Sequence, residues 1–122
     1  MERPHYNIAQ VNEMALFGLF DTRELEEFAT GLATDLGRRF PPASEKRTDT
    51  GKEHQIKVIL DGLTARAVRY EEQHKLGIYR KAKLANVFRW KLTELGYSSE
   101  FVERATKQIV TRIAAKKKAA AS

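Results

Sequence analysis

The chain has 122 residues, with 22 lysine and arginine side chains against 16 aspartate and glutamate, and it contains no cysteine. Chains of this length usually form one domain that buries a core without disulfides or metals. The lack of cysteine excludes disulfides, thiolate zinc sites and cysteine nucleophiles. No window has the roughly 18 apolar residues of a membrane-spanning helix and no signal-peptide segment follows the N-terminus, so we expect a soluble, cytoplasmic protein.

Charge is distributed unevenly along the chain. Residues 1–36 carry two basic and seven acidic side chains, a net charge of −5, whereas residues 76–122 carry eleven basic and three acidic, a net charge of +8. The basic C-terminal half could attract phosphates or acidic proteins. Alternatively, the two oppositely charged parts attract each other, within one fold or between subunits.

The segment from Ile8 to Phe20 predicts a first helix, because apolar residues recur along it at helical spacing. Its apolar side chains cover nearly the whole circumference, so the helix needs cover on nearly every side. Either it is a central core helix, or it forms a subunit interface, for which the candidates are Met14, Phe17 and Phe20.

A second helix is predicted from the capping-box pair Asp21 and Glu24 to Phe40, with prolines at 41 and 42 ending it. Its inward stripe consists of Leu25, Phe28, Ala29, Leu32, Leu36 and Phe40. The following residues, 41–51, are rich in proline, serine, threonine and charge, and predict a flexible surface linker.

From Lys52 onward a third helix is predicted, with the inward stripe Ile56, Ile59, Leu60, Leu63, Ala67 and Tyr70. We expect it to stop near Lys75, with Gly77 as the left-handed residue that ends it. A fifth helix is predicted after a serine cap at 98 or 99, with Phe101, Val102, Ala105, Ile109 and Ile113 facing inward. Beyond Ile113 the tail carries no large apolar side chain, and we expect it to fray.

The stretch from Ile78 to Tyr97 predicts a fourth helix, on which both faces are specialised. One arc of the helical wheel is apolar and should face the core; it consists of Ile78, Leu84, Ala85, Phe88, Leu92 and Leu95. The opposite side carries Tyr79, Lys83, Asn86 and Trp90 at spacings of four, three and four residues. Gly96 and Tyr97 predict a Schellman-type end to this helix.

No run alternates apolar and polar residues over the length of a strand. The sequence therefore predicts an all-α fold: a compact bundle of about five helices with a flexible linker near residues 41–51. We expect a single helical domain over residues 1–115 and a basic, disordered tail over residues 116–122.

Catalytic and metal-binding motifs are missing. There is no phosphate loop, no Gly-x-Ser-x-Gly and no His-Glu-x-x-His, and the Asp-Thr-Gly at 49–51 lies in a polar linker without a β scaffold. His54 and His74 are about 30 Å apart on one predicted helix, too far to share an ion, and we expect His74 to be a partly buried residue at the helix end. We predict neither an enzyme nor a cofactor or metal site.

Two functions are consistent with these features. In the first, the protein is a non-enzymatic helical interaction module that self-associates or binds a protein partner through Met14, Phe17, Phe20, Tyr79 and Trp90. In the second, it binds DNA or RNA through the basic outer face of the fourth helix and the lysine tail, using Arg80, Lys83, Asn86, Arg89, Trp90, Lys116, Lys117 and Lys118. The division of charge favours the first.

Overall fold

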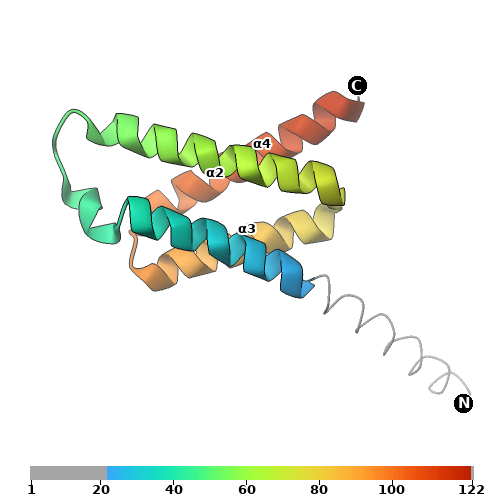
Figure 1. Ribbon diagram of the computed structural model, residues 1–122, viewed down its shortest axis with the longest axis horizontal. Coiled ribbons are helices and arrows are strands. Elements are labelled where there is room, and N and C mark those ends of the chain that lie inside the picture. Colours follow the sequence, from blue (N-terminus) through green and yellow to red (C-terminus); the bar gives the residue numbers. More distant parts are fainter. Residues whose placement is uncertain (1–21, 122) are drawn as a thin grey trace, which may run out of the picture.

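The computed structural model describes residues 22–121, and the side chains of residues 22–115. Within this range the chain forms a helix over residues 22–39, the 3-10 helix η1 (Pro42–Lys46), α2 (Lys52–His74), α3 (Ile78–Leu95) and α4 (Ser99–Ala121) (Figure 1). No strand occurs among the described residues, so the all-α prediction is confirmed. The predicted first helix, Ile8–Phe20, lies outside them.

The four α-helices run alternately up and down and form two layers (Figure 1). The 22–39 helix and α2 make one layer, and α3 and α4 lie behind them. The 22–39 helix contacts α2 through the stacked rings of Phe28 and Tyr70, whose centroids are 4.0 Å apart, and contacts α3 through an ion pair of Glu26 with Lys83. Residue 22, the α2–α3 turn and the end of α4 therefore lie at the same end of the bundle.

The core lies between the two layers and is built from the predicted inward stripes. Leucine, isoleucine and alanine fill most of it, and the rings of Phe40, Phe88 and Phe101 add the largest buried surfaces. Burial of this apolar area is the main force that holds the helices together, since most helical stability in proteins comes from packing of an apolar face. Every inward residue predicted for α4 is buried, from Phe101 to Ile113.

The junction between α3 and α4 forms as its sequence predicts. Gly96 adopts the left-handed conformation with φ of 109°, the Gly96 N–H donates to the Thr93 carbonyl, and the Tyr97 N–H donates to the Leu92 carbonyl. These are the two hydrogen bonds of a Schellman cap. Ser98 is the N-cap of α4, because its Oγ accepts a hydrogen bond from the Phe101 N–H at 3.2 Å.

The turn between α2 and α3 differs from the prediction. The left-handed residue is Lys75, with φ of 51°, whereas Gly77 has φ of −83° and is the N-cap of α3. Leu76 between them is buried. The chain has to reverse before Leu76 for that side chain to reach the core, and this places the left-handed residue on Lys75 despite its Cβ.

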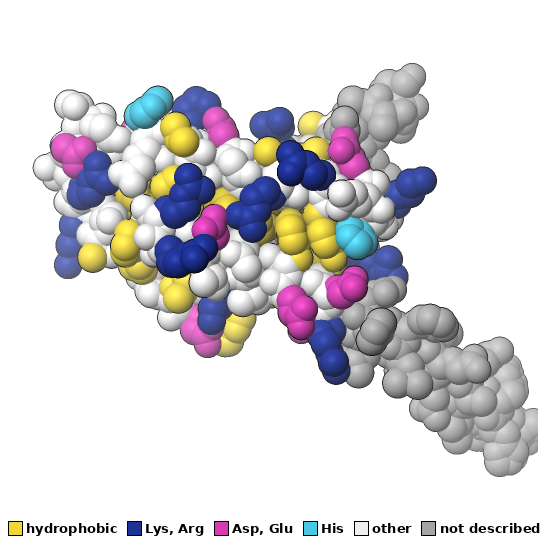
Figure 2. Space-filling model, viewed as in Figure 1, with side chains coloured by type: hydrophobic (Ala, Val, Ile, Leu, Met, Phe, Trp, Pro, Cys, Tyr) yellow, Lys and Arg dark blue, Asp and Glu magenta, His cyan; other side chains and the backbone are white. Residues whose placement is uncertain are grey.

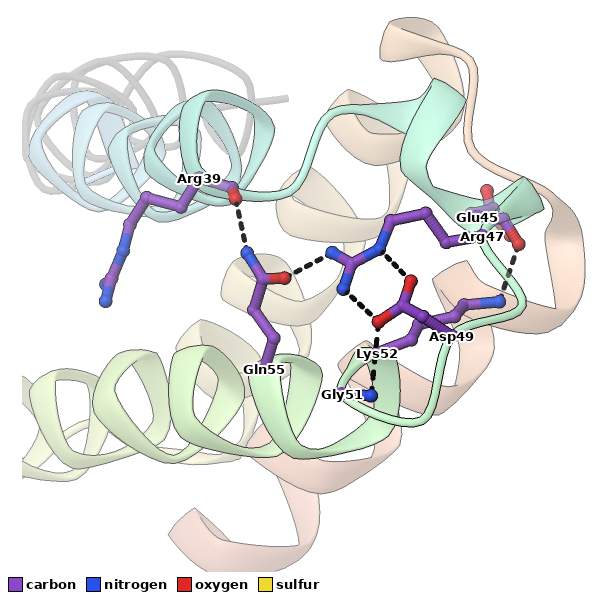
Figure 3. A network of polar contacts seen from close by, with 7 residues as sticks. All are labelled: Arg39, Glu45, Arg47, Asp49, Gly51, Lys52 and Gln55. Atoms are coloured by element: carbon purple, nitrogen blue, oxygen red, sulfur yellow. Dashed lines mark hydrogen bonds and ion pairs between the residues drawn. The ribbon is translucent and has the colours of Figure 1, made fainter.

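The linker of residues 41–51 contains η1 and a polar network that its composition did not predict (Figure 3). The Arg47 guanidinium donates two hydrogen bonds of 2.7 Å to the two carboxylate oxygens of Asp49 and a third to the side chain of Gln55. Gln55, in α2, also donates to the main-chain carbonyl of Arg39 at 3.2 Å. These bonds connect the linker to both helices that it joins. Its predicted mobility in solution stays a prediction.

Candidate interaction surface

The outer ridge of α3 carries two exposed aromatic side chains. Tyr79 is 72% exposed and Trp90 is 66% exposed. They lie on one face because eleven residues are close to three full turns, about 16 Å along the axis. Their exposure follows from the opposite arc, where Leu84, Phe88 and Leu92 are buried and turn this ridge away from the core.

Two residues assigned to the buried arc of this helix are not buried. Ile78 is 84% exposed and Leu95 is 38% exposed. They occupy the first and last positions of α3. A helical wheel gives the direction of a side chain but not the length over which neighbouring helices cover it, so its errors fall at the helix ends.

Exposed Ile78 borders an apolar groove between the first half of α3 and the last described turns of α4. The groove has a volume of about 230 Å³. It is lined by Ile78, Lys81, Ala82, Leu84, Ala85, Val110, Ile113 and Ala114. Alanine at 82, 85 and 114 leaves the space that forms it, and Val110, 40% exposed, lies on its α4 side. Lys81 is the one ionisable residue among these described lining residues.

The cations on α3 that were candidates for nucleic-acid binding have acidic neighbours. Lys83 lies 3.4 Å from Glu26, and this ion pair joins the acidic N-terminal part to the basic C-terminal half. Arg89 contacts the Glu103 carboxylate at 3.0 Å and donates to the Asn86 side chain at 3.1 Å. Arg80 also has an interaction partner. Charges paired in this way attract phosphates less strongly than unpaired ones.

Several candidate residues fall outside the described part of the chain. Met14, Phe17 and Phe20 precede it, and the side chains of Lys116, Lys117 and Lys118 are beyond the last described side chain, although the helical backbone of α4 continues to Ala121. Whether that last turn frays in solution stays a prediction.

The layer of the 22–39 helix and α2 carries a different electrostatic pattern. Figure 2 shows lysine and arginine side chains gathered around a few acidic ones on this face. Asp35 accepts hydrogen bonds from Arg38 at 2.6 Å and from Arg66 at 3.0 Å. Burial by itself would raise the pKa of Asp35, but the Arg38 hydrogen bond and the charges of Arg66, Arg38 and Arg39 outweigh it and lower the pKa below its usual value. This cluster joins two helices.

His54 and His74, the two histidines among residues 22–115, show no metal-binding arrangement. In residues 22–115, no group of three histidine, cysteine or acidic side chains is placed to hold an ion. His74 is exposed rather than partly buried as predicted, because it stands at the last position of α2, where it lies against the Tyr70 ring with a centroid distance of 4.1 Å.

A second hollow lies at the other end of the bundle, between η1 and the first turns of α2 and α4. It has a volume of about 160 Å³ and a polar lining. Four of its lining residues are paired: Glu45 accepts hydrogen bonds from the N–H and hydroxyl of Ser98, and Arg104 pairs with Glu53 at 2.7 Å. We attribute a structural role to this hollow, because these contacts hold η1 and the start of α4 together.

The sequence pattern did not predict the α3–α4 groove. Val110 is the residue that could have indicated it, since it is apolar and lies outside the inward stripe of its helix. Which helix α4 packs against is a tertiary property, and a groove depends on that pairing.

None of the helices in the described residues is both apolar and long enough to cross a bilayer. Comparisons with protein families, with curated proteins and with solved structures found no significant match to this chain.

Proposed function

We propose that this protein is a non-enzymatic helical interaction module that self-associates through the outer side of α3. The observation that carries the proposal is the exposure of Tyr79 and Trp90 on one ridge of one helix. Together with Ile78 they present large apolar surfaces next to an apolar groove. Tyrosine and tryptophan at such positions contribute strongly to protein interfaces, because they bury a large area at a small cost in conformational entropy.

The groove favours binding over catalysis. Among the described lining residues Lys81 is the one ionisable group, and general acid–base chemistry needs a pair of such groups. Its lining is otherwise aliphatic, as in surfaces that accept the apolar face of another helix.

Pairing of the α3 cations argues against the nucleic-acid function. Lys83 and Arg89 flank the aromatic ridge, and each already contacts a glutamate. Binding a phosphate there would require breaking or sharing those pairs. Apolar burial of the aromatic rings needs no such rearrangement, so a protein partner fits this ridge better.

The experiment measures the mass of the full chain in solution, by light scattering after size exclusion, with nuclease treatment during purification. We expect a mass that is a multiple of the 13.9 kDa protomer. The double variant Tyr79→Ala/Trp90→Ala should shift the mass towards the protomer. Val58→Ala, which truncates an exposed apolar side chain on α2, is the matched control and should leave the mass unchanged.

Two results would contradict the proposal. One is a mass of 13.9 kDa at every concentration up to the solubility limit. The other is binding of DNA or RNA that weakens steeply with salt and is lost in Trp90→Ala, since that result would favour the second function.

A further inference from the structure

We infer that the α3–α4 groove of one protomer binds residues 8–20 of a second protomer, and that two copies exchange these segments reciprocally. This inference rests on the proposed self-association and adds to it a contact in the groove next to the aromatic ridge. Reciprocal exchange gives a two-fold dimer, the symmetry most often found in homo-oligomers.

The groove and the segment have matching chemistry. The groove is lined by aliphatic side chains and is open where Ile78 and Val110 are exposed. The segment carries Phe17 and Phe20 on one face of the helix that its sequence predicts. A segment that is apolar on nearly every side needs more than one covering surface, and a dimer provides both the partner's groove and the partner's own segment.

The charges at the edge of the groove complement a charge in the segment of residues 8–20. Glu13 is four residues before Phe17 and lies on the same face of the predicted helix. Lys81 lines the groove, and Lys107 is one turn before Val110 on α4. Neither lysine forms an ion pair within the described residues, whereas Lys83 on the other flank of α3 pairs with Glu26. Glu13 entering beside Phe17 would meet these two cations.

Chain connectivity favours a second copy over the protomer's own groove. Lys83 faces the 22–39 helix through its contact with Glu26, while Ala85, roughly 160° further round the α3 axis, lines the groove. α3 therefore lies between the start of the 22–39 helix and the groove, and a helix with side chains is about 10 Å across. Phe20 is two residues before Thr22, and two residues span at most about 7 Å of backbone, less than the width of α3, so a second copy reaches the groove with Phe20 more readily than the same chain does.

The two phenylalanines supply about half of the area that a stable dimer needs. A buried phenylalanine removes at least about 150 Å² from water. Phe17 and Phe20 from both copies therefore contribute on the order of 600 Å² before the groove's own surface is added. Stable interfaces begin at about 1,200 Å² in total, counted over both partners.

The first test places a charge in the groove. Ala82 is exposed and lines the groove, and Ala65 is an equally exposed alanine in the middle of α2. Ala82→Glu should raise the dimer dissociation constant by roughly a hundredfold, because an unpaired carboxylate would be buried against apolar side chains. Ala65→Glu adds the same charge elsewhere and should leave the constant unchanged.

The second test identifies the segment by disulfide trapping, for which the chain is suited because it has no cysteine. ¹⁵N-labelled Phe17→Cys protein is mixed with unlabelled Ala82→Cys protein, and mixed disulfides are detected by mass spectrometry. We expect several times more mixed disulfide than in the control mixture with Ala65→Cys.

The outcomes separate the two proposals. A dimer that Ala82→Glu dissociates, with trapping specific to residue 82, supports both. A dimer that both glutamate variants leave intact, or trapping that is equal at 65 and 82, overturns the groove contact and leaves self-association standing. A monomeric wild type overturns both proposals. In that case a disulfide within one chain of the double variant Phe17→Cys/Ala82→Cys would mean that the segment binds the groove of its own protomer.

Discussion

Removing the Tyr97 hydroxyl tests how the bundle is closed at the end away from the groove. Tyr97 is buried in the turn between α3 and α4, and its hydroxyl donates a hydrogen bond to the Phe40 carbonyl at the end of the 22–39 helix. Its ring stacks on Phe101 with a centroid distance of 4.9 Å. Tyr97→Phe keeps this ring contact and removes only the donor.

The expected cost follows from the carbonyl that loses its donor. A buried acceptor without a donor costs about 1–3 kcal/mol, so Tyr97→Phe should lower the free energy of unfolding by about that amount at pH 7. In a domain of this size each kcal/mol corresponds to roughly 4 °C in melting temperature. Tyr79→Phe removes an exposed hydroxyl from the same kind of side chain and should change neither quantity.

The pH dependence provides a second, independent readout. Burial first, and the nearby charge of Glu45 second, raise the pKa of Tyr97 from 10.0 to about 12. The folded state therefore favours the neutral phenol more than the unfolded state does. The stability that this preference contributes is fully present below pH 10 and is lost as the pH rises towards about 12. A shift of two units corresponds to roughly 2–3 kcal/mol.

Urea unfolding followed by circular dichroism at pH 7 and pH 11 measures both effects. The wild type and Tyr79→Phe should lose stability between these two pH values by more than Tyr97→Phe does. The reasoning is refuted if Tyr97→Phe is as stable as the wild type at pH 7 and shows the same loss at pH 11.

Three further substitutions have expected effects on stability, each measurable by the same unfolding experiment. Thr106→Val should stabilise by about 1 kcal/mol, because the Thr106 hydroxyl is buried without a hydrogen-bond partner in the described structure. Lys75→Gly should stabilise by roughly 0.5–1 kcal/mol, since glycine adopts the left-handed conformation of Lys75 without strain. The hydrogen bond from Arg47 lowers the pKa of Asp49 from 3.8 to about 2, so the ionised carboxylate stabilises the fold above this range and that stabilisation is lost as the pH falls through it. Asp49→Asn should therefore lose less stability than the wild type between pH 3.8 and about 2.

Local patterns explain why much of this fold could be predicted from sequence. The stripe from Phe101 to Ile113 and the cap at Gly96 depend on residues at most five positions apart, and local interactions of that range determine both. The predicted position of the left-handed residue in the α2–α3 turn was wrong because it depends on longer-range packing. The geometry of this turn is set by burial of Leu76 in a core made of distant segments, and a scan for glycine cannot detect that requirement.

The candidate site was predicted in part for a related reason. Exposure of Tyr79 and Trp90 follows from the wheel of one helix, so their positions could be inferred. The partners of Lys83 and Arg89 could not, since Glu26 and Glu103 are 57 and 14 residues away in the chain. These ion pairs weaken the case for phosphate binding by Lys83 and Arg89 and support the proposal that the ridge binds a protein.

The two ends of the bundle differ in a way that makes stability and association separable. At one end, polar contacts of Tyr97, Ser98 and Arg47 connect the turn, η1 and the start of α2. At the other, the groove beside Ala82 is apolar and open. Ala82 and Leu95 are thirteen residues apart on α3, about 20 Å along its axis, and substitutions at that distance usually act independently. Tyr97→Phe should therefore change unfolding without changing the mass in solution. Ala82→Glu should change the mass and should leave unfolding unchanged at protein concentrations where the wild type is also monomeric.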